Sequence, residues 1–226
     1  MSFPLEGDAR PQLTPLLIAT RNPGKLTELR ALFASAGYDA VDLAAAGVPP
    51  SPDEETVEAF DTFEENALAK ARYYHEASGG MPTVADDSGL TVAALGGAPG
   101  VRSRRWALGD ASEGNETEGS ETAANNAKLL RELAGAADRR ARFVCVVGYV
   151  DGSASILERG ETGGRIARSP RGTAGFGYDP LFESAELGWR TFGEVRAEDK
   201  ASVSHRTRAF VRLIQRLKGE AHSGPS

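Results

Sequence analysis

The sequence predicts an α/β domain, because short apolar runs with strand character alternate with segments whose apolar residues recur at helical spacing. The chain has 226 residues, 40% of them hydrophobic, which suffices for one sizeable core in a single domain or in two closely joined lobes. It has no internal repeat and no long linker. We therefore assign one domain to residues 16–218, with flexible tails at 1–15 and 219–226 that are rich in Pro, Gly, Ser and charge.

The first half of the chain is predicted to alternate between strands and helices. Thr62 and Glu65 have capping-box spacing at the start of the second helix. The polar residues 86–89 are expected to end the third strand, and a tight glycine-rich loop at 96–100 follows an apolar stretch, 90–95. In order, the elements are a strand at 16–20, a helix with Leu26, Leu29, Leu32 and Phe33 on one face and Gly37 at its end, a strand at 38–43, a loop at 48–56, a helix at 63–77 and a strand at 82–85.

The second half is predicted to contain a hairpin between two helices. Asp151-Gly152 is a turn pair suited to joining two antiparallel strands. The elements are a solvated Gly-, Glu- and Ser-rich stretch at 109–122, a helix at about 123–133, strands at 143–150 and 154–161, a Gly/Pro/Arg-rich loop at 168–177, and a last helix at 204–218 with Phe210, Leu213, Ile214 and Leu217 on one face.

Composition excludes several classes of protein. The net charge of −6 gives no basic surplus of the kind that duplex-binding proteins show, so we expect no nucleic-acid partner. The longest apolar runs are far shorter than the roughly 20 residues of a membrane helix, and residues 1–15 lack the apolar core of a secretory signal. We therefore expect no membrane association and a cytoplasmic location. The single Cys145, in an apolar run, is interpreted as a buried structural thiol.

A candidate anion site lies between the first strand and the first helix. Backbone N–H groups at a helix start carry partial positive charge, Gly24 lets the backbone approach an anion, and Lys25 adds a full charge. The alternative is an ordinary turn capped by Asn22. The six residues are Thr20, Arg21, Asn22, Pro23, Gly24 and Lys25.

Candidate metal-binding and catalytic residues follow the third strand. Adjacent carboxylates, Asp86 and Asp87, are costly after an apolar strand unless they bind a cation or accept hydrogen bonds. One could hold magnesium and activate a water, and the other could support it or serve as the base. The alternative is a polar turn. A Glu of the acidic stretch 53–58 could complete the metal site, and Lys70 could bind phosphate or lie at the surface.

Two further segments suit a flat ligand. The glycine-rich stretch 172–180 permits close packing, and Phe176 offers a ring for stacking unless it belongs to the core. Asp179 could accept hydrogen bonds or hold the loop. The segment 200–206 supplies donors from His205 and Arg206, with Ser204 as a possible helix cap.

Together these segments resemble the non-canonical purine nucleoside triphosphate pyrophosphatases, the Ham1-like family of inosine/xanthosine triphosphate pyrophosphatases. The resemblance runs from Leu16 to Leu217. Its motifs, in order, are Thr20–Lys25, Phe63–Ala67 with Lys70, Ala85–Leu90, Gly96–Gly100, Asn125–Leu130, Arg171–Phe182 and Glu198–Arg206. It implies an α/β fold with a long central mixed sheet flanked by helices, two lobes with the active-site cleft between them, and a homodimer.

The resemblance also implies a role for each motif. Asp87 is then the catalytic base and a Mg²⁺ ligand, with Asp86 beside it and Ser88 touching substrate. The segment between Glu55 and Phe63 is longer than the family pattern, so the second ligand shifts, and we select Glu55 over Glu54 and Glu58. The other implied substrate contacts are Thr20–Lys25, Lys70, Phe176, Gly177, Tyr178, Asp179, Lys200, His205 and Arg206.

The expected activity is hydrolysis of ITP, dITP and XTP to the monophosphate and pyrophosphate. A 6-keto base presents an acceptor where adenine presents a donor, so donors from His205 and Arg206 would favour hypoxanthine or xanthine. Two alternatives remain open. One is a related pyrophosphatase for pyrimidine or modified nucleotides, and the other is a nucleotide sensor without catalysis.

Overall fold

The computed structural model describes residues 13–107 and 118–221, so the predicted tails lie largely outside the described residues. Within this part, one seven-stranded mixed sheet has the order β2-β1-β3-β4-β5-β6-β7. The strands are β1 (Thr14–Ile18), β2 (Tyr38–Asp42), β3 (Thr83–Val92), β4 (Arg140–Val150), β5 (Ser155–Ile166), β6 (Phe182–Ser184) and β7 (Arg190–Thr191).

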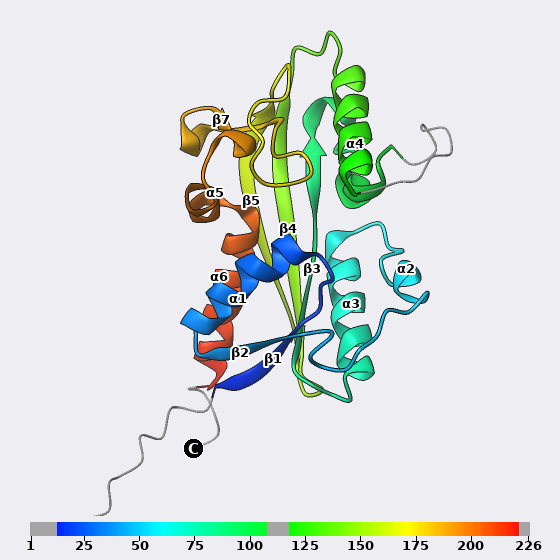
Figure 1. Cartoon of the computed structure of the whole chain (residues 1–226), viewed down its shortest axis with the longest axis vertical. Coiled ribbons are helices and arrows are strands. Elements are labelled where there is room, and N and C mark those ends of the chain that lie inside the picture. Colours follow the sequence, from blue (N-terminus) through cyan, green and yellow to red (C-terminus); the bar gives the residue numbers. More distant parts are fainter. Residues whose placement is uncertain (1–12, 108–117, 222–226) are drawn as a thin grey trace, which may run out of the picture.

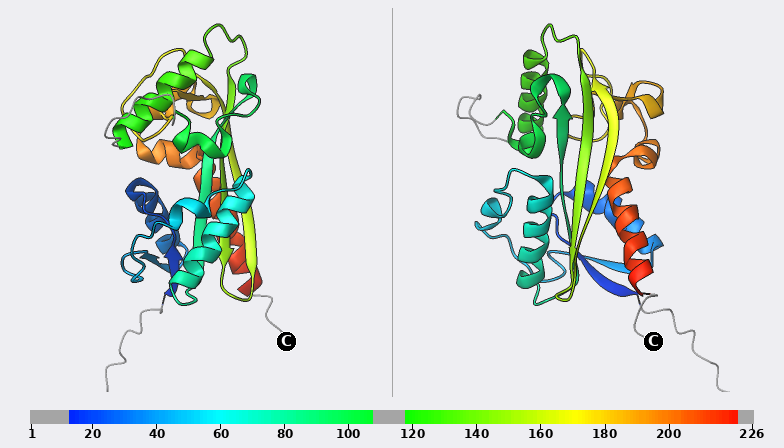
Figure 2. Two further views of the ribbon diagram at one scale, coloured as in Figure 1. Left: turned by 90° about the vertical axis from the view of Figure 1, so that its right-hand side faces the viewer. Right: turned by 180° about the vertical axis from the view of Figure 1, so that it is seen from behind.

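Helices cover both faces of the sheet (Figures 1 and 2). The α-helices are α1 (Pro23–Ser35), α2 (Glu54–Val57), α3 (Phe63–Ala77), α4 (Glu118–Glu132), α5 (Ala197–Val203) and α6 (His205–Ala221). Four short 3-10 helices are η1 (Ala93–Leu95), η2 (Gly100–Arg105), η3 (Ala185–Leu187) and η4 (Phe192–Glu194). None of the helices in the described part of the chain has the length and apolar character needed to cross a bilayer.

Three long antiparallel strands join two lobes. Strands β3, β4 and β5 run the length of the molecule, with β1, β2, α1, α3 and α6 around one end and α4, α5 and β7 around the other (Figure 1). Each end has its own core. Phe33 and Phe210 belong to the first, and Phe182 and Phe192 to the second. The expected two-lobed mixed sheet is therefore confirmed.

Alternation along the strands assigns side chains to the two faces. Leu16, Ile18 and Val84 pack with α1 and α6, whereas Leu17 and Ala85 pack with α3. Because successive strand residues point to opposite faces, the same alternation continues into the acidic residues that follow.

The main difference from the predicted elements is the length of β3. It continues through the acidic residues to Val92 instead of ending at Ala85, because ten consecutive residues pair with β4. Cross-strand pairing thus overrides the local polar character of residues 86–89.

Other predicted boundaries shift by smaller amounts. The helix at 63–77 is confirmed, with the Thr62 hydroxyl accepting a hydrogen bond from the Glu65 N–H at 3.2 Å. The hairpin at residues 151–154 is confirmed, although β5 extends five residues further than predicted. The loop predicted at 48–56 contains the start of the single turn α2. Helix α4 begins at Glu118 and not near 123, while residues 109–117 of the stretch predicted to be solvated lie outside the described residues. The tails are shorter than predicted, since Thr14 belongs to β1 and α6 reaches Ala221.

Candidate active site

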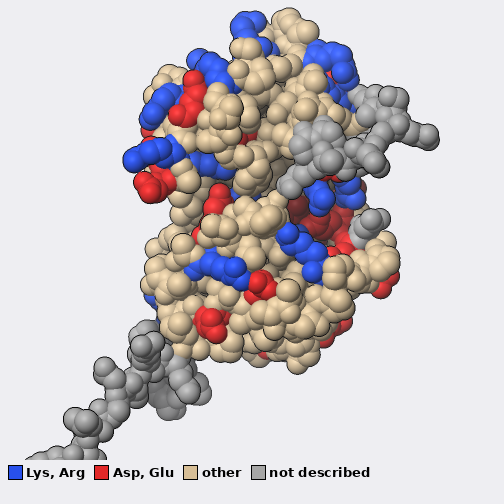
Figure 3. Space-filling model, viewed as in Figure 1, with Lys and Arg blue, Asp and Glu red and all other residues tan. Residues whose placement is uncertain are grey.

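The candidate site lies where β1 ends and the edge of β3 becomes open. Strand β1 pairs with β3 at Leu17–Thr83 and Ile18–Val84, the Ala19 N–H donates to the Val84 carbonyl at 2.8 Å, and the chain then leads across to α1. Asp86 and Asp87 are the next side chains on the α1/α6 face and the α3 face of β3. In the space-filling view, acidic and basic side chains gather in a hollow between the two ends of the molecule (Figure 3).

Asp86 is the buried centre of a cationic cluster. Its side chain is 1% exposed, and Oδ2 lies 2.9 Å from Lys25 Nζ and 3.7 Å from Arg206 Nε. Burial alone would raise the pKa of Asp86, but the charges of Lys25, Arg206 and Lys70 outweigh it and hold the pKa well below its usual range. Asp86 therefore stays ionised and holds two cations from different elements, α1 and α6, in one place.

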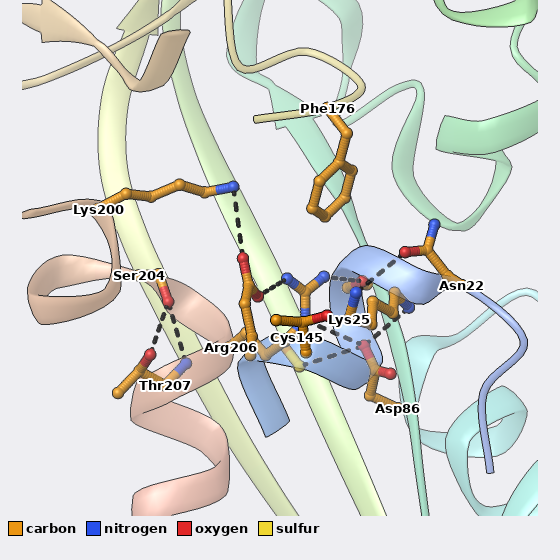
Figure 4. A network of polar contacts seen from close by, with 12 residues as sticks. Asn22, Lys25, Asp86, Cys145, Phe176, Lys200, Ser204, Arg206 and Thr207 are labelled. Atoms are coloured by element: carbon orange, nitrogen blue, oxygen red, sulfur yellow. Dashed lines mark hydrogen bonds and ion pairs between the residues drawn. The ribbon is translucent and has the colours of Figure 1, made fainter. Parts of the chain in front are cut away.

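Glu28 extends this cluster toward the second lobe. It lies on α1, with Oε2 at 2.7 Å from Arg206 Nη1 and Oε1 at 3.9 Å from Lys200 Nζ. Arg206 also donates a 3.5 Å hydrogen bond to the Ser88 hydroxyl. Figure 4 shows the ring of Phe176 directed toward this network, opposite Asp86. Segments that are far apart in sequence thus meet in one place.

The loop that carries Phe176 is fixed by Asp179. The buried Asp179 carboxylate accepts hydrogen bonds from the Phe176 N–H at 2.8 Å and from Lys200 Nζ at 2.7 Å. Lys200 Nζ lies 4.6 Å from the Phe176 ring centre. A Cβ atom added to Gly24 would lie 3.6 Å from the same ring, so the ring closes over the start of α1. The ring, a buried cation and a helix N-terminus suit a ligand with a flat part and an anionic part.

Asp87 faces α3 and carries an unusual charge environment. Burial, followed by the nearby charge of Glu58, raises the pKa of Asp87 to about 6, although a 3.0 Å hydrogen bond from Asn66 Nδ2 acts in the opposite direction. Lys70 Nζ lies 2.5 Å from Glu58 and 3.5 Å from the main-chain oxygen of Asp86. A carboxylate with a pKa near neutral, in a cleft with cations, is suited to proton transfer or to cation binding.

His205 begins α6 and is buried against the aromatic core. Its ring stacks on Phe143 with centroids 4.8 Å apart and planes 11° apart. Burial and then the charges of Arg206 and Lys200 lower the pKa of His205 well below its usual value, so the ring is neutral. The Ser204 hydroxyl accepts a hydrogen bond from the N–H of Thr207 at 3.1 Å, which confirms that Ser204 caps the helix.

Several predicted site residues are held by contacts of their own. Arg21 pairs with Glu54 at 2.6 Å, and Asn22 Oδ1 caps α1 by accepting from the Lys25 N–H at 3.0 Å. The Tyr178 side chain is 5% exposed and donates to the Ser103 carbonyl at 2.8 Å, so it belongs to the core and not to the cleft. Thr20 lies in the turn before α1, and Pro23 is the first residue of that helix. The Gly177 carbonyl accepts a hydrogen bond from Asn126 Nδ2 at 3.1 Å.

Glu58 makes contacts beside Asp87 that are described in the structure. Glu55 lies in α2, and its side chain is outside the described ones. The Glu54 side chain forms an ion pair with Arg21, whereas the charge of Glu58 raises the pKa of Asp87. Of the three candidates, Glu58 is therefore the one whose described contacts lie beside Asp87.

Asn66 and Glu28 belong to the site although the motifs did not single them out as contacts. Glu28 follows Lys25 by three residues and therefore shares its helix face, a spacing that could have identified it. Asn66 is in a motif of the family resemblance, but its partner is 21 residues away. Cys145 is buried as predicted, with its sulfur 3.8 Å from Asp86 Oδ2. Burial raises the pKa of this thiol, which is consistent with a structural role.

The donor set suits a hard divalent cation. Among the described residues there is no group of three or more His, Cys, Asp or Glu side chains that would enclose a metal by itself. Mg²⁺, however, usually takes only one or two carboxylates and completes its shell with phosphate oxygens and water. Asp87 and Glu58 could supply two oxygen ligands. The pKa of Asp87 is raised by burial and then by the charge of Glu58, and a cation beside both carboxylates would oppose both effects.

The fold and the site define an α/β protein in which cations, carboxylates and an aromatic ring from distant segments meet between two lobes. A family model described as the Ham1 family matches residues 16–216. The chain belongs to the Ham1 family.

Proteins of known sequence and structure agree with this assignment. The chain is 45% identical over 206 residues to the dITP/XTP pyrophosphatase of Ralstonia nicotianae, with 90% of this chain and 96% of that protein covered. It is 46% identical over 213 residues to the dITP/XTP pyrophosphatase of Mycobacterium tuberculosis, with 92% and 98% covered. A HAM1 protein structure from Coxiella burnetii superposes with a TM-score of 0.77 at 35% identity, covering 92% of this chain and all of that one.

Proposed function

We propose that this protein is a Mg²⁺-dependent nucleoside triphosphate pyrophosphohydrolase that converts ITP, dITP and XTP to monophosphate and pyrophosphate. Such an activity removes non-canonical purines from the nucleotide pool. The name dITP/XTP pyrophosphatase, carried by relatives at 45–46% identity, supports the substrate class. The observation that carries the proposal is the meeting of Lys25, Arg206 and Phe176 around Asp86, with Asp87 on the other face of β3.

The polyphosphate is proposed to bind along the start of α1. The partial positive charge at the N-terminus of α1, the charge of Lys25 and the charge of Lys70 favour phosphate oxygens. Because Lys25 is held by Asp86 and Lys70 by Glu58, both cations are preorganised before the substrate arrives. Each such group can contribute on the order of 3 kcal/mol to transition-state stabilisation. The proposed contacts of the turn are Thr20, Arg21, Asn22, Pro23, Gly24 and Lys25.

Asp87 is proposed to be the catalytic base and, with Glu58, to hold the metal. Bound Mg²⁺ would polarise phosphate oxygens and neutralise their charge. Asp87 would orient a water and take its proton at a carboxylate oxygen. The water oxygen then forms a bond to phosphorus, the bond between the α- and β-phosphates breaks, and pyrophosphate leaves from the monophosphate. Asn66 already occupies Oδ2, and among the described residues no hydrogen bond to Oδ1 is present. Asp86 supports this chemistry indirectly, as the counter-charge of Lys25 and Arg206.

The base is proposed to lie against Phe176, near the start of α6. His205 is neutral there, and Arg206 is a permanent cation, so both can donate to a 6-keto oxygen. Lys200 and Asp179 fix the position of the loop that carries the Phe176 ring. Gly177 and Tyr178 contribute through the backbone of that loop, and Ser88 contributes through its contact with Arg206.

Assembly and location are part of the same proposal. The family resemblance favours a homodimer and a small-molecule substrate in the cytoplasm. The acidic net charge argues against a nucleic-acid partner, and the short apolar runs argue against a membrane partner. Light scattering after gel filtration measures the assembly directly, and a monomer at micromolar concentration would contradict it.

The experiment for the proposed function is pyrophosphate release from ITP, XTP, dITP, GTP, ATP and dUTP, with and without Mg²⁺. We expect the first three to be used far better than ATP, with discrimination that can reach ~10⁴ for a site built on hydrogen bonds. Comparable turnover of ITP and ATP would rule out the proposed base readout, and preferred turnover of dUTP would favour a pyrimidine substrate.

A matched pair of arginine variants tests the position of the base pocket. Arg206→Ala removes a cation of the cluster, whereas Arg208→Ala removes an arginine on the same helix that contacts Glu186 and the Glu161 carbonyl. We expect only Arg206→Ala to reduce kcat/KM for ITP by at least about 100-fold. Equal losses in both variants would contradict the proposed location.

A further inference from the structure

Asn66 on α3 connects two parts of the site that are separate in sequence. The side chain is 1% exposed. Its Oδ1 accepts a hydrogen bond from the Phe60 N–H at 2.9 Å, while Nδ2 donates to the Phe60 carbonyl at 3.1 Å and to Asp87 Oδ2 at 3.0 Å. One buried amide thus bonds to both main-chain groups of a loop residue and to the proposed catalytic carboxylate.

The three contacts fix which way the amide faces. Both Nδ2 hydrogens and the oxygen are in use. In the flipped orientation, Oδ1 would face the carboxylate of Asp87 and the Phe60 carbonyl, and Nδ2 would face the Phe60 N–H, so all three contacts would become repulsive. The amide therefore has one stable orientation, and the position of Phe60 relative to Asp87 is set with it.

The loop held by Asn66 carries Glu58. Only Ala59 separates Glu58 from Phe60, so a displacement of the Phe60 backbone moves the carboxylate. Arg105 of η2 donates to the Glu58 main-chain oxygen at 3.3 Å, but this bond is exposed, whereas Asn66 is buried. Asn66 is thus the buried anchor of the loop.

The close packing of α3 on the sheet allows the Asn66 side chain to reach Asp87. A Cβ atom added to Gly148 of β4 would lie 2.9 Å from the Ala67 main-chain oxygen, so the helix backbone rests directly on this glycine. Asn66 precedes Ala67 and consequently reaches Asp87 on the neighbouring strand β3. A short amide side chain suffices for this distance.

We propose that Asn66 is a positioning residue that joins the Glu58 loop to Asp87, so that both carboxylates can bind the same divalent cation. This inference rests on the proposed function. It adds a residue that touches neither substrate nor metal. Loss of Asn66 removes both bonds to the Phe60 backbone and leaves Asp87 without its only described amide donor. The Glu58 loop keeps its bonds to Lys70 and Arg105, but neither of these residues donates a described hydrogen bond to Asp87, so the two ligands lose their common geometry.

The test compares Asn66→Ala with Thr62→Ala in the full chain. Thr62 caps the same helix but contacts neither Phe60 nor Asp87 in the described structure, so its loss destabilises α3 without releasing the loop. Binding of Mn²⁺ without nucleotide is measured by electron paramagnetic resonance of the free ion. We also measure the melting temperatures of the apo proteins. Steady-state assays with ITP give kcat, KM and the Mg²⁺ activation constant.

We expect Asn66→Ala to weaken Mn²⁺ binding and to raise the Mg²⁺ activation constant by at least about tenfold, in the range known for residues that orient metal ligands. KM for ITP at saturating Mg²⁺ should change less than threefold, whereas Thr62→Ala should bind Mn²⁺ within twofold of wild type. If Asn66→Ala does not fold, Asn66→Ser, whose hydroxyl cannot reach both partners, is judged by the same criteria.

Each contrary outcome has a separate meaning. Equal Mn²⁺ binding by wild type and Asn66→Ala overturns the role of Asn66 while leaving the metal site intact. If Asn66→Ala and Thr62→Ala lose Mn²⁺ affinity to the same extent, Asn66 only stabilises the helix, and the inference is overturned as well. A wild-type protein that binds no Mn²⁺ while hydrolysing ITP overturns the metal site, and with it any role of Asn66 there.

Discussion

Replacing Asp87 with asparagine should stabilise the metal-free protein although it abolishes activity. Burial and Glu58 raise the pKa of Asp87 from 3.8 to about 6. A change of this size disfavours the ionised form by about 3 kcal/mol at neutral pH, since each pH unit corresponds to about 1.36 kcal/mol. Asparagine is neutral and of equal size, and its side-chain oxygen can still accept the hydrogen bond from Asn66. The substitution thus removes a buried charge without opening a cavity.

The sign of the pH dependence follows from proton binding. Between about pH 4 and pH 6, the folded protein binds more protons at Asp87 than the unfolded chain does, so its contribution to stability falls as the pH rises through this window. Below the window Asp87 is neutral in both states. We therefore expect Asp87→Asn to raise the free energy of unfolding by up to about 3 kcal/mol at pH 7.5 and by almost nothing at pH 4.

Urea unfolding followed by far-ultraviolet circular dichroism, in EDTA at both pH values, measures the effect. Glu58→Gln is the control, because the Glu58 pKa is lowered by Lys70 and its neutralisation should destabilise the protein instead. Turnover of ITP by Asp87→Asn should fall at least ~100-fold. A loss of stability at pH 7.5, or a gain independent of pH, would refute the electrostatic reasoning.

Three further predictions follow from the same cleft. Asp86→Asn leaves Lys25 without its counter-charge and Arg206 with Glu28 alone, and urea unfolding should show a loss of about 3–5 kcal/mol, whereas a neutral effect would contradict the cluster. Gly175→Ala places a Cβ atom 2.0 Å from Asp179 Oδ2, at a backbone φ of +76° that favours glycine. The clash displaces the loop that carries Phe176, so KM for ITP should rise about tenfold in steady-state assays. An unchanged KM would show that this loop does not contribute to substrate binding. Removal of divalent ions with EDTA should reduce pyrophosphate release to background, Mg²⁺ should restore it, and activity that persists in EDTA would exclude an essential metal.

The elements with strong local signals were predictable from the sequence. Helix α3 has the predicted bounds because Thr62 caps it and its apolar residues follow the helical period. The hairpin between β4 and β5 was likewise indicated by Asp151-Gly152 between two apolar runs.

The end of β3 was not predictable, because its continuation depends on a partner strand. Asp86 and Asp87 resemble a turn when only neighbouring residues are considered. Pairing with Val147 and Val146 of β4 keeps both in the strand, and the two carboxylates therefore lie on opposite faces with different partners.

Many residues of the candidate site were predictable from the sequence, but the contacts between them were not. Motifs indicated Lys25, Asp87 and Phe176, since each lies in a segment with unusual local chemistry. The contacts of Asn66 with Asp87 and of Glu28 with Arg206 span 21 and 178 residues, and no local pattern records them. Such contacts depend on how α1 and α3 pack on the sheet.

The most direct test of the central claim, that cations and carboxylates from distant segments form one pyrophosphohydrolase site, is product identification by ³¹P NMR. Wild-type protein with ITP and Mg²⁺ should yield IMP and pyrophosphate in equal amounts, and Asp87→Asn should yield neither at a comparable rate. Formation of IDP and orthophosphate, or undiminished turnover by the variant, would contradict the account.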